Sequence, residues 1–229
     1  MKTMQPYVIT IDGPSGSGKG SLALQVARKL GFHLLDSGAI YRLAALKALN
    51  EGVDLNDEAA VHAAIKGMDI HFEAGDALTL PFLDGKDVSA QIRTEQTASA
   101  ASIIAAYPSV RAELLDVQRN FFKPPGLVAD GRDMGTVVFP DAKIKIFLHA
   151  SSEIRAKRRH KQLIDMGLSA NIADLQKEIE TRDERDRNRS VSPLAPASDA
   201  VVVDSSMMAL DQVVDLVMSH IDDVNNKRV

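Results

Sequence analysis

The stretch YVITIDGPSGSGKGSLALQVARKL, residues 7–30, determines the expected fold. An apolar run, YVITI, leads into DGPSGSGKGS at residues 12–21, where four glycines and three serines surround one lysine. Ordered glycine is entropically costly, so this cluster indicates a backbone conformation that other residues rarely adopt. A preceding strand and a following helix are the context in which the G-x-x-x-x-G-K pattern of Gly13 to Lys19 predicts a phosphate-binding loop.

The chemistry of this loop predicts a bound nucleotide. Converging backbone N–H groups and the helix N-terminus favour phosphate oxygens, and Lys19 is expected to reach the β- and γ-phosphates. ATP and Mg²⁺ are the expected cofactors, because phosphate charge must be neutralised for transfer. Gly20 replaces the usual Ser or Thr, so no direct protein ligand of Mg²⁺ is predicted. The alternative is a flexible turn with a solvated lysine. The predicted cofactor-binding loop residues are Gly13, Pro14, Ser15, Gly16, Ser17, Gly18, Lys19, Gly20 and Ser21.

Composition limits the remaining classes of protein. The chain has 229 residues, 45% hydrophobic and 25% charged, which is enough for a sizeable core. A net charge of -4 predicts no general attraction to nucleic acid or to acidic membranes. The absence of cysteine excludes disulfides and thiolate metal sites, and no apolar stretch approaches the roughly 20 residues that span a bilayer. We therefore expect a cytoplasmic protein without a membrane or nucleic-acid partner, and the six histidines show no metal-binding spacing.

Short apolar runs alternate with helical patterns along the chain. Near-continuous apolar runs are typical of a parallel sheet that is covered on both faces. The expected fold class is α/β, a P-loop NTPase with a five-stranded parallel sheet and helices on both faces. The predicted strands are 7–12, 33–36, 126–130, 143–150 and 200–204, and the predicted helices are 18–30, 38–50, 108–121, 151–166, 171–188 and 208–224.

The interval between residues 36 and 126 is too long for one crossover connection. Within it, MDIHFE (68–73) and ALTLPFLDGKDVSAQI (77–92) predict a small antiparallel sheet that turns at AGD (74–76) and DGKD (84–87). We therefore predict three parts. They are a P-loop core of 1–60, 108–150 and 190–229, an inserted small α/β subdomain of 61–107 and a helical lid of 151–189.

Charged residues follow two of the predicted strands. LLDSGAIYR (34–42) ends a strand at Asp36, with Ser37 as the expected helix N-cap and Tyr41 and Arg42 one turn later. LVADGRDMG (127–135) repeats the pattern with Asp130, Gly131, Arg132 and Asp133. Ligands bind at the carboxyl ends of strands in open α/β sheets, so these side chains are candidate ligand contacts. A helix cap with a surface arginine, or a simple turn, is the alternative.

Residues 153–190 contain ten Lys or Arg and eight Asp or Glu. Arg182, Arg185 and Arg189 recur on one helical face, and the preceding helix carries Arg155, Arg158 and Arg159. A solvated hairpin with i,i+4 ion pairs would explain much of this pattern. The excess of arginine over lysine favours a lid over phosphates, because guanidinium groups hold phosphoryl oxygens bidentately.

Four stretches together resemble the bacterial cytidylate kinases: TIDGPSGSGKGS, LLDSGAIYR, GLVADGRDMGTVVFPDA and ETRDERDRNRS. The resemblance implies an enzyme that transfers a phosphoryl group from ATP-Mg to CMP or dCMP, yielding CDP or dCDP. It also implies a monomer, and an insertion that binds the nucleoside monophosphate. A monophosphate oxygen is already substantially ionised at neutral pH, so no general base is assigned.

The resemblance also implies a role for individual residues. Arg42 and Arg132 would hold the CMP phosphate, and the lid arginines would close over the ATP phosphates. The implied catalytic residues are Lys19, Arg132, Arg182 and Arg189, and the implied cofactor contacts in the lid are Arg158 and Arg159. The implied substrate-binding residues are Asp36, Ser37, Tyr41, Arg42, Ser102, Arg111, Asp130, Arg132, Asp133, Arg182 and Asp186, of which Ser102, Arg111 and Asp133 would meet the cytosine and Arg182 and Asp186 the sugar.

Two other hypotheses stay open from the residues alone. A small-metabolite kinase of the same fold would share the glycine loop, and so would a nucleotide-dependent switch with little turnover. No N-K-x-D guanine motif is present, since the nearest stretch, NNKRV, lacks the aspartate. The preference between CMP and dCMP, the tolerance of UMP and the range of phosphate donors are not determined by these patterns.

Overall fold

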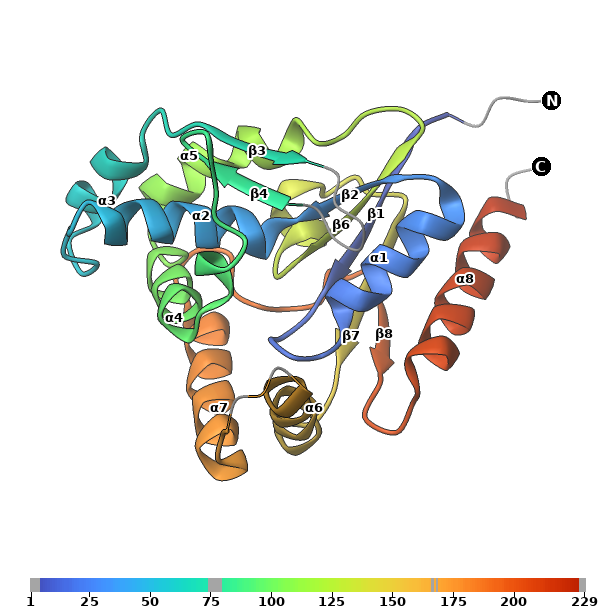
Figure 1. Ribbon diagram of the computed structural model, residues 1–229. Helices are drawn as coiled ribbons and strands as arrows, with labels where there is room; N and C mark the ends of the chain where they lie inside the picture. Colours follow the sequence, from blue (N-terminus) through green and yellow to red (C-terminus); the bar gives the residue numbers. More distant parts are fainter. Residues whose placement is uncertain (1–4, 74–79, 166, 168, 227–229) are drawn as a thin grey trace. The chain divides into compact units, whose positions relative to one another are not determined.

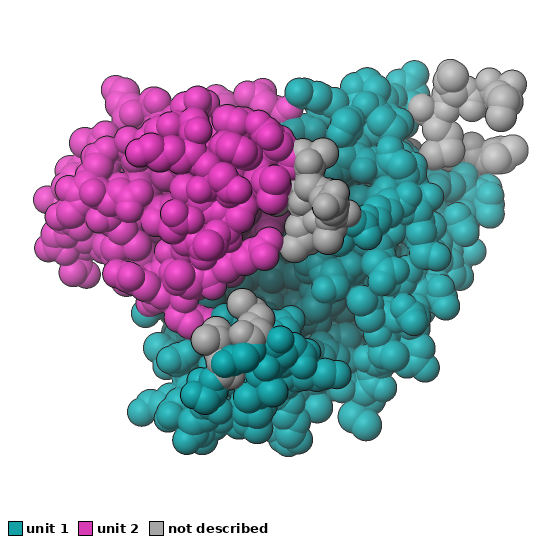
Figure 2. All heavy atoms as spheres, viewed as in Figure 1, with its two compact units in different colours: residues 1–35, 121–229 teal, residues 36–120 magenta. Residues whose placement is uncertain are grey.

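The computed structural model describes residues 5–73, 80–165, 167 and 169–226. The chain divides into two compact units, shown in different colours in Figure 2. Residues 1–35 and 121–229 form the first, which we call the core unit, and residues 36–120 form the second, which we call the inserted unit. Among the described residues, none of the helices combines the length and apolar character that crossing a bilayer requires.

The core unit is built on a five-stranded sheet. Its strands are β1 (Tyr7–Asp12), β2 (His33–Asp36), β6 (Gly126–Gly131), β7 (Ile144–His149) and β8 (Val201–Asp204), in the order β2-β6-β1-β7-β8. Strand β1 pairs in parallel with β6 and β7, and β7 pairs in parallel with β8. The predicted five-stranded parallel sheet is confirmed, and each strand agrees with the prediction to within one residue at either end.

The hydrophobic core lies between this sheet and two helices. Helices α1 (Lys19–Leu30) and α8 (Leu210–Asn226) lie next to each other and cover one face of the sheet (Figure 1). Ile9 and Ile11 of β1 are fully buried in this core. Because side chains alternate along a strand, Thr10 and Asp12 face the opposite side, where the helical turn η2 (Met134–Val138) lies.

Two helices of the core unit form a hairpin where the lid was predicted, and its role as a lid stays a prediction. They are α6 (Ser152–Asp165) and α7 (Ile172–Asn188), and they pack through a small apolar cluster of Ala156, Leu163, Leu175 and Ile179. Leu175 and Ile179 are four residues apart, so they lie on one face of α7. The hairpin is therefore held together in part by its own buried apolar seam.

The described residues of the inserted unit form four helices and a small sheet. The helices are α2 (Ser37–Asn50), α3 (Glu58–Ile65), α4 (Glu95–Ile104) and α5 (Pro108–Arg119), with a short 3₁₀ turn η1 (Gln91–Arg93). The antiparallel strands β3 (Ile70–Glu73), β4 (Leu80–Leu83) and β5 (Lys86–Asp87) match the predicted antiparallel sheet. Asp84 and Gly85 both have positive φ at the predicted DGKD turn, as a tight hairpin requires, and the predicted AGD turn at 74–76 lies outside the described residues.

The inserted unit is larger than the predicted insertion of 61–107. Helices α2 and α5, which were predicted as part of the core, belong to it because α2 packs on α4 and α5 packs on α3. Helices α3 and α4 were not predicted at all. The limits of the inserted unit are therefore set by the packing of its helices. They do not coincide with the point at which strands and helices stop alternating along the sequence.

Candidate active site

The glycine loop between β1 and α1 is shaped by close contacts. A Cβ atom on Gly13 would lie 2.0 Å from the carbonyl oxygen of Leu148, so only glycine fits there. Gly16 and Gly18 have φ of 74° and 93°, in the left-handed region that favours glycine. Lys19 donates to the carbonyl oxygen of Pro14 at 3.2 Å, which turns its ammonium group back over the loop. The arrangement explains why so many glycines occur in ten positions.

We expect Gly13→Ala to lower the free energy of unfolding by about 2 to 3 kcal/mol, because the new methyl group overlaps a backbone atom that cannot move away. Urea denaturation measures this. Gly31→Ala is the matched control: Gly31 has φ of 66°, and a Cβ atom on it would meet nothing within 4 Å, so it reports backbone strain alone, about 1 to 2 kcal/mol. Equal losses in both variants would contradict the steric explanation.

The end of β6 approaches the start of α1. Asp130 is buried, and its Oδ1 lies 4.0 Å from the Lys19 ammonium nitrogen. A Cβ atom on Gly20 would lie 3.2 Å from Oδ2 of Asp130, which is tighter than ordinary contact. The structure thus supplies a steric reason for glycine at the position where Ser or Thr is usual in such loops.

Three arginines surround one buried carboxylate at the end of α7. Asp186 accepts a hydrogen bond from Nε of Arg132 at 3.0 Å. Burial alone would raise the pKa of Asp186, but the charges of Arg132, Arg189 and Arg182 outweigh it and lower the pKa. The charges of these three arginines thus favour the ionised form of Asp186, and arginine is the side chain best suited to hold phosphoryl oxygens.

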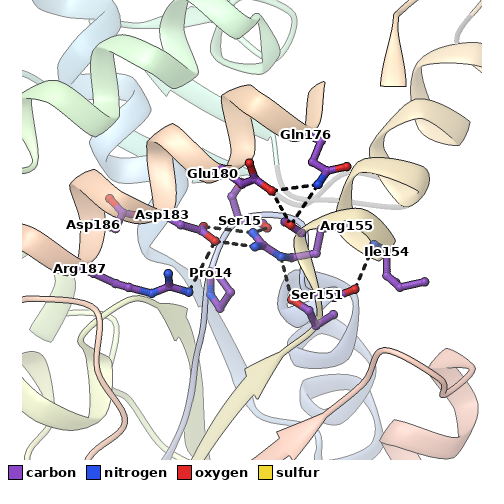
Figure 3. Close-up of polar contacts among 12 residues, drawn as sticks. Pro14, Ser15, Ser151, Ile154, Arg155, Gln176, Glu180, Asp183, Asp186 and Arg187 are labelled. Carbon is purple, nitrogen blue, oxygen red and sulfur yellow. Dashed lines mark hydrogen bonds and ion pairs between the residues drawn. The ribbon is translucent and has the colours of Figure 1, made fainter. Parts of the chain in front are cut away.

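A second buried ion pair links the two helices of the hairpin, and its arginine also contacts the glycine loop (Figure 3). The guanidinium of Arg155 on α6 donates to both carboxylate oxygens of Asp183 on α7, at 3.0 and 2.5 Å. It also donates to the carbonyl oxygen of Ser15 at 2.9 Å and to that of Ala150 at 2.9 Å. Arg155 and Asp183 are 2% and 3% exposed, so one arginine ties α6, α7 and the loop together in a dry environment.

Sequence reasoning placed Arg155 in the lid but assigned it no role, and it missed Asp183. A signal was present in the spacing: Asp183 continues the apolar stripe of Leu175 and Ile179 at intervals of four residues. A carboxylate on the buried face of a helix requires a buried partner.

Arg158 bonds to backbone atoms of the glycine loop and of the segment after β8. Its Nη1 donates to the carbonyl oxygen of Ser17 at 3.0 Å, and its Nη2 donates to the carbonyl oxygen of Ser205 at 2.6 Å. Burial lowers the pKa of Arg158 below the ordinary arginine value. Arg159 is half-buried on the same helix. Contact of either side chain with ATP phosphates stays a prediction.

The inserted unit carries the other predicted substrate residues. Asp36 is the N-cap of α2 and accepts from the backbone N–H of Ala39 at 2.9 Å, so the prediction of Ser37 as the cap is wrong. Asp36 is the last residue with an extended backbone, and this conformation lets its carboxylate accept from a free amide of the first turn. Ser37 is already the first residue of the helix. Ser37 instead accepts a hydrogen bond from Nε2 of Gln118 at 2.8 Å.

Within this unit the structure brings Tyr41 and Arg111 together. The guanidinium carbon of Arg111 lies 5.6 Å from the centre of the Tyr41 ring, and its Nη1 donates to the carbonyl oxygen of Ala105 at 3.1 Å. Ser102 is buried on α4, and Arg42 is half-buried on α2. The predicted site residues are thus divided between the units: Asp36, Ser37, Tyr41, Arg42, Ser102 and Arg111 belong to the inserted unit, and the others belong to the core unit.

The parallel sheet, the glycine loop and the arginines around Asp186 define a P-loop phosphotransferase. A family profile described as cytidylate kinase matches residues 9–223. A cytidylate kinase of Vibrio parahaemolyticus is 55% identical over 218 residues, covering 95% of this chain and 96% of that protein. Those of Aeromonas salmonicida and Pasteurella multocida are 55% and 52% identical, covering 96% and 93% of this chain and 95% and 94% of theirs. The chain belongs to the cytidylate kinase family, a family of nucleoside monophosphate kinases, which confirms the resemblance in its sequence.

Proposed function

We propose that the protein transfers the γ-phosphoryl group of ATP, bound as its Mg²⁺ complex, to CMP and dCMP, and releases CDP and dCDP with ADP. The observation that carries this proposal is the Arg155 connection. It bonds the glycine loop to Asp183, and Asp186 follows on the same helix less than one turn later. The glycine loop and the helix end that carries Asp186 are therefore attached to each other in one unit, which supports a role for both in binding phosphate groups.

Charge stabilisation and alignment supply most of the catalysis in phosphoryl transfer. Lys19 would neutralise the charge that develops on the transferred group, together with the lid arginines Arg182 and Arg189. Arg132 and Arg42 would hold the acceptor phosphate so that one of its oxygens points at the γ-phosphorus. The remaining lid cations, Arg158 and Arg159, would contact the ATP phosphates after the hairpin closes and excludes water.

Mg²⁺ would neutralise the ATP phosphates and help to align them. Among the described residues, no group of three or more His, Asp or Glu side chains gathers as a metal site. In phosphoryl-transfer enzymes Mg²⁺ commonly keeps several waters and is bound by the substrate phosphates with one or two carboxylates. The location in the cytoplasm and the monomeric state stay predictions.

The base-recognition residues predict selectivity for cytosine. Cytosine presents an amino donor and a ring-nitrogen acceptor, which suit a carboxylate such as Asp133 and a donor such as Arg111. Uracil presents the opposite pattern, and each mispaired buried group costs about 1 to 3 kcal/mol. We expect UMP to have a kcat/KM about 10 to 100 times lower than that of CMP.

An assay of ADP release tests this expectation with CMP, dCMP, UMP, AMP and shikimate-like alcohols as acceptors. Turnover with the two cytidine nucleotides, and weak turnover with UMP, supports the proposal. Turnover with an alcohol instead would favour a small-metabolite kinase, and ATP binding without turnover on any acceptor would favour a nucleotide-dependent switch.

A further inference from the structure

Asp12 is a buried carboxylate to which the proposed mechanism assigns no role. It is the last residue of β1 and immediately precedes Gly13, the first glycine of the loop. Its side chain lies on the sheet face opposite Ile9 and Ile11, and the residue is 5% exposed. The backbone of Asp12 therefore leads into the ATP-binding loop, while its side chain points to a different part of the core unit.

The side chain of Asp12 holds two successive backbone amides. Oδ1 accepts the N–H of Met134 at 2.8 Å, and Oδ2 accepts the N–H of Gly135 at 2.8 Å. In the sheet, Asp12 is the partner of Gly131 on the neighbouring strand β6. Asp12 therefore contacts both ends of one turn: Gly131 through the pairing of the strands, and Met134 and Gly135 through its carboxylate. The residues between these ends are Arg132 and Asp133.

The turn is also pressed closely against β1. A Cβ atom on Gly135 would lie 2.8 Å from the hydroxyl oxygen of Thr10 and 3.1 Å from Cδ of Lys145. Glycine thus permits the amide of residue 135 to reach the carboxylate of Asp12. Asp133 is 2% exposed, so the turn has little room to shift once both amides are bound.

We propose that Asp12 is a positioning residue: by clamping the amides of Met134 and Gly135, it fixes the turn that presents Arg132 and Asp133 to the phosphoryl acceptor. This inference rests on the proposed function, because that function assigns Arg132 to the acceptor phosphate and Asp133 to its base. Asp12 would join the two halves of the reaction, since the ATP loop begins at its carbonyl group and the acceptor turn ends at its carboxylate.

The electrostatics of Asp12 make the clamp sensitive to pH. Burial raises the pKa of Asp12 to about 7, the bonds from Gly135 and Met134 oppose this rise, and the charges of Asp133 and Asp130 add to it. The nearby cations have other partners: Lys145 donates to Pro140 and Asp199, Arg132 donates to Asp186, and Lys19 lies within 4.0 Å of Asp130. The ionised carboxylate accepts both amides, whereas the neutral acid uses one oxygen to carry its proton.

The same titration affects stability with the opposite sign. The pKa of Asp12 in the folded protein lies above the ordinary value of 3.8, so the folded state binds the proton more tightly than the unfolded state does. The contribution of Asp12 to stability therefore falls as the pH rises from about 4 to about 7. A charge that costs stability in its working form is typical of a functional position.

The test compares the wild type with Asp12→Asn at pH values between about 5.5 and 8. Asn resembles the neutral acid, so the two proteins should be similar at the lower pH. We expect the ratio of wild-type to variant kcat/KM for CMP, measured as CDP formed, to rise at least about tenfold by pH 8. The ratio removes the titration of the CMP phosphate, whose second pKa is near 6. Over the same range, the Tm difference should shift in favour of the variant.

Asp57→Asn is the matched control, since Asp57 also accepts a backbone amide, that of Ala60, but at the N-cap of α3. Its ratio to the wild type should stay near one at every pH, because Asn caps helices as well as Asp does. A ratio for Asp12→Asn that is constant with pH, or that follows a loss of Tm, would overturn the inference.

A second measurement needs no variant. In the wild type, the NMR amide shifts of Met134 and Gly135 should titrate together with a midpoint near pH 7. Flat shifts would overturn the inference even if Asp12→Asn fails to fold. If the wild type phosphorylates CMP but the ratio of wild-type to Asp12→Asn kcat/KM does not change with pH, only the role of Asp12 is rejected. If the wild type does not phosphorylate CMP at any pH, the proposed function is rejected, and the role of Asp12 with it.

Discussion

Replacing Lys19 by Met is expected to lower kcat by about 10² to 10³-fold, the usual effect of removing one group that stabilises transition-state charge. The side chain of Lys19 is 11% exposed, and its ammonium group lies over the loop, bonded to the carbonyl oxygen of Pro14. The carboxylate of Asp130 is 4.0 Å away, which is too far for a hydrogen bond. Because the variant removes a positive charge near the buried carboxylate of Asp130, the free energy of unfolding should also fall, by about 1 to 3 kcal/mol.

Steady-state kinetics with CMP and ATP, together with urea denaturation, checks this result. Lys29→Met is the control, because Lys29 is an exposed lysine in the last turn of the same helix. It should keep the wild-type kcat. A Lys19→Met enzyme with normal kcat and a raised KM for ATP would show that the ammonium group binds ATP and the transition state equally, contrary to the proposed role.

The second large effect is on stability. We expect Asp183→Asn to lower the free energy of unfolding by about 3 to 5 kcal/mol, because it leaves the Arg155 charge buried without its counter-charge. Arg155 and Asp183 are both almost fully buried, and the pair is bidentate. Activity should fall as well, since the same guanidinium holds the carbonyl oxygen of Ser15 in the glycine loop.

Two further variants separate burial from charge in this result. Arg187 approaches the same carboxylate at 3.8 Å, but its side chain is 62% exposed, so Arg187→Met should cost about 1 kcal/mol or less. The double variant Arg155→Met with Asp183→Leu should recover much of the lost stability, because it leaves no buried charge unpaired. Urea denaturation measures these changes. If Asp183→Asn and Arg187→Met lower the free energy of unfolding equally, solvent screens both ion pairs to the same degree and burial of the Arg155 pair does not explain the result.

The sequence by itself determined the sheet and the glycine loop. The five strands are short apolar runs, and that pattern is local, so it was sufficient to predict them. The central strands β6, β1 and β7 are almost entirely buried, as a covered parallel sheet requires, whereas the edge strands β2 and β8 are largely exposed. The loop was predictable because its pattern is also local. Gly16 and Gly18 are favoured by a left-handed backbone conformation, which is a local property, whereas the close contact that requires Gly13 is with Leu148, far along the chain.

Short helices and the limits of the inserted unit were harder to predict. Helices α3 and α4 have only eight and ten residues, and their caps, Asp57 and Thr94, are the main local signals of where they begin. The unit includes α2 and α5 because these helices pack on α4 and α3. Packing between helices distant in sequence is a tertiary property, and the alternation of strands and helices does not contain it.

Only the tertiary structure decided which charged residues are buried and with whom. Arg155 and Arg187 are both arginines of a charged hairpin, yet one is enclosed with Asp183 and the other is largely exposed. In the sequence, Asp12 is only the last residue of a strand. In the structure, its carboxylate accepts from two backbone amides, those of Met134 and Gly135, more than a hundred positions away. A charge can be buried only where its partners converge on it in space, and residue types along the chain do not specify that convergence.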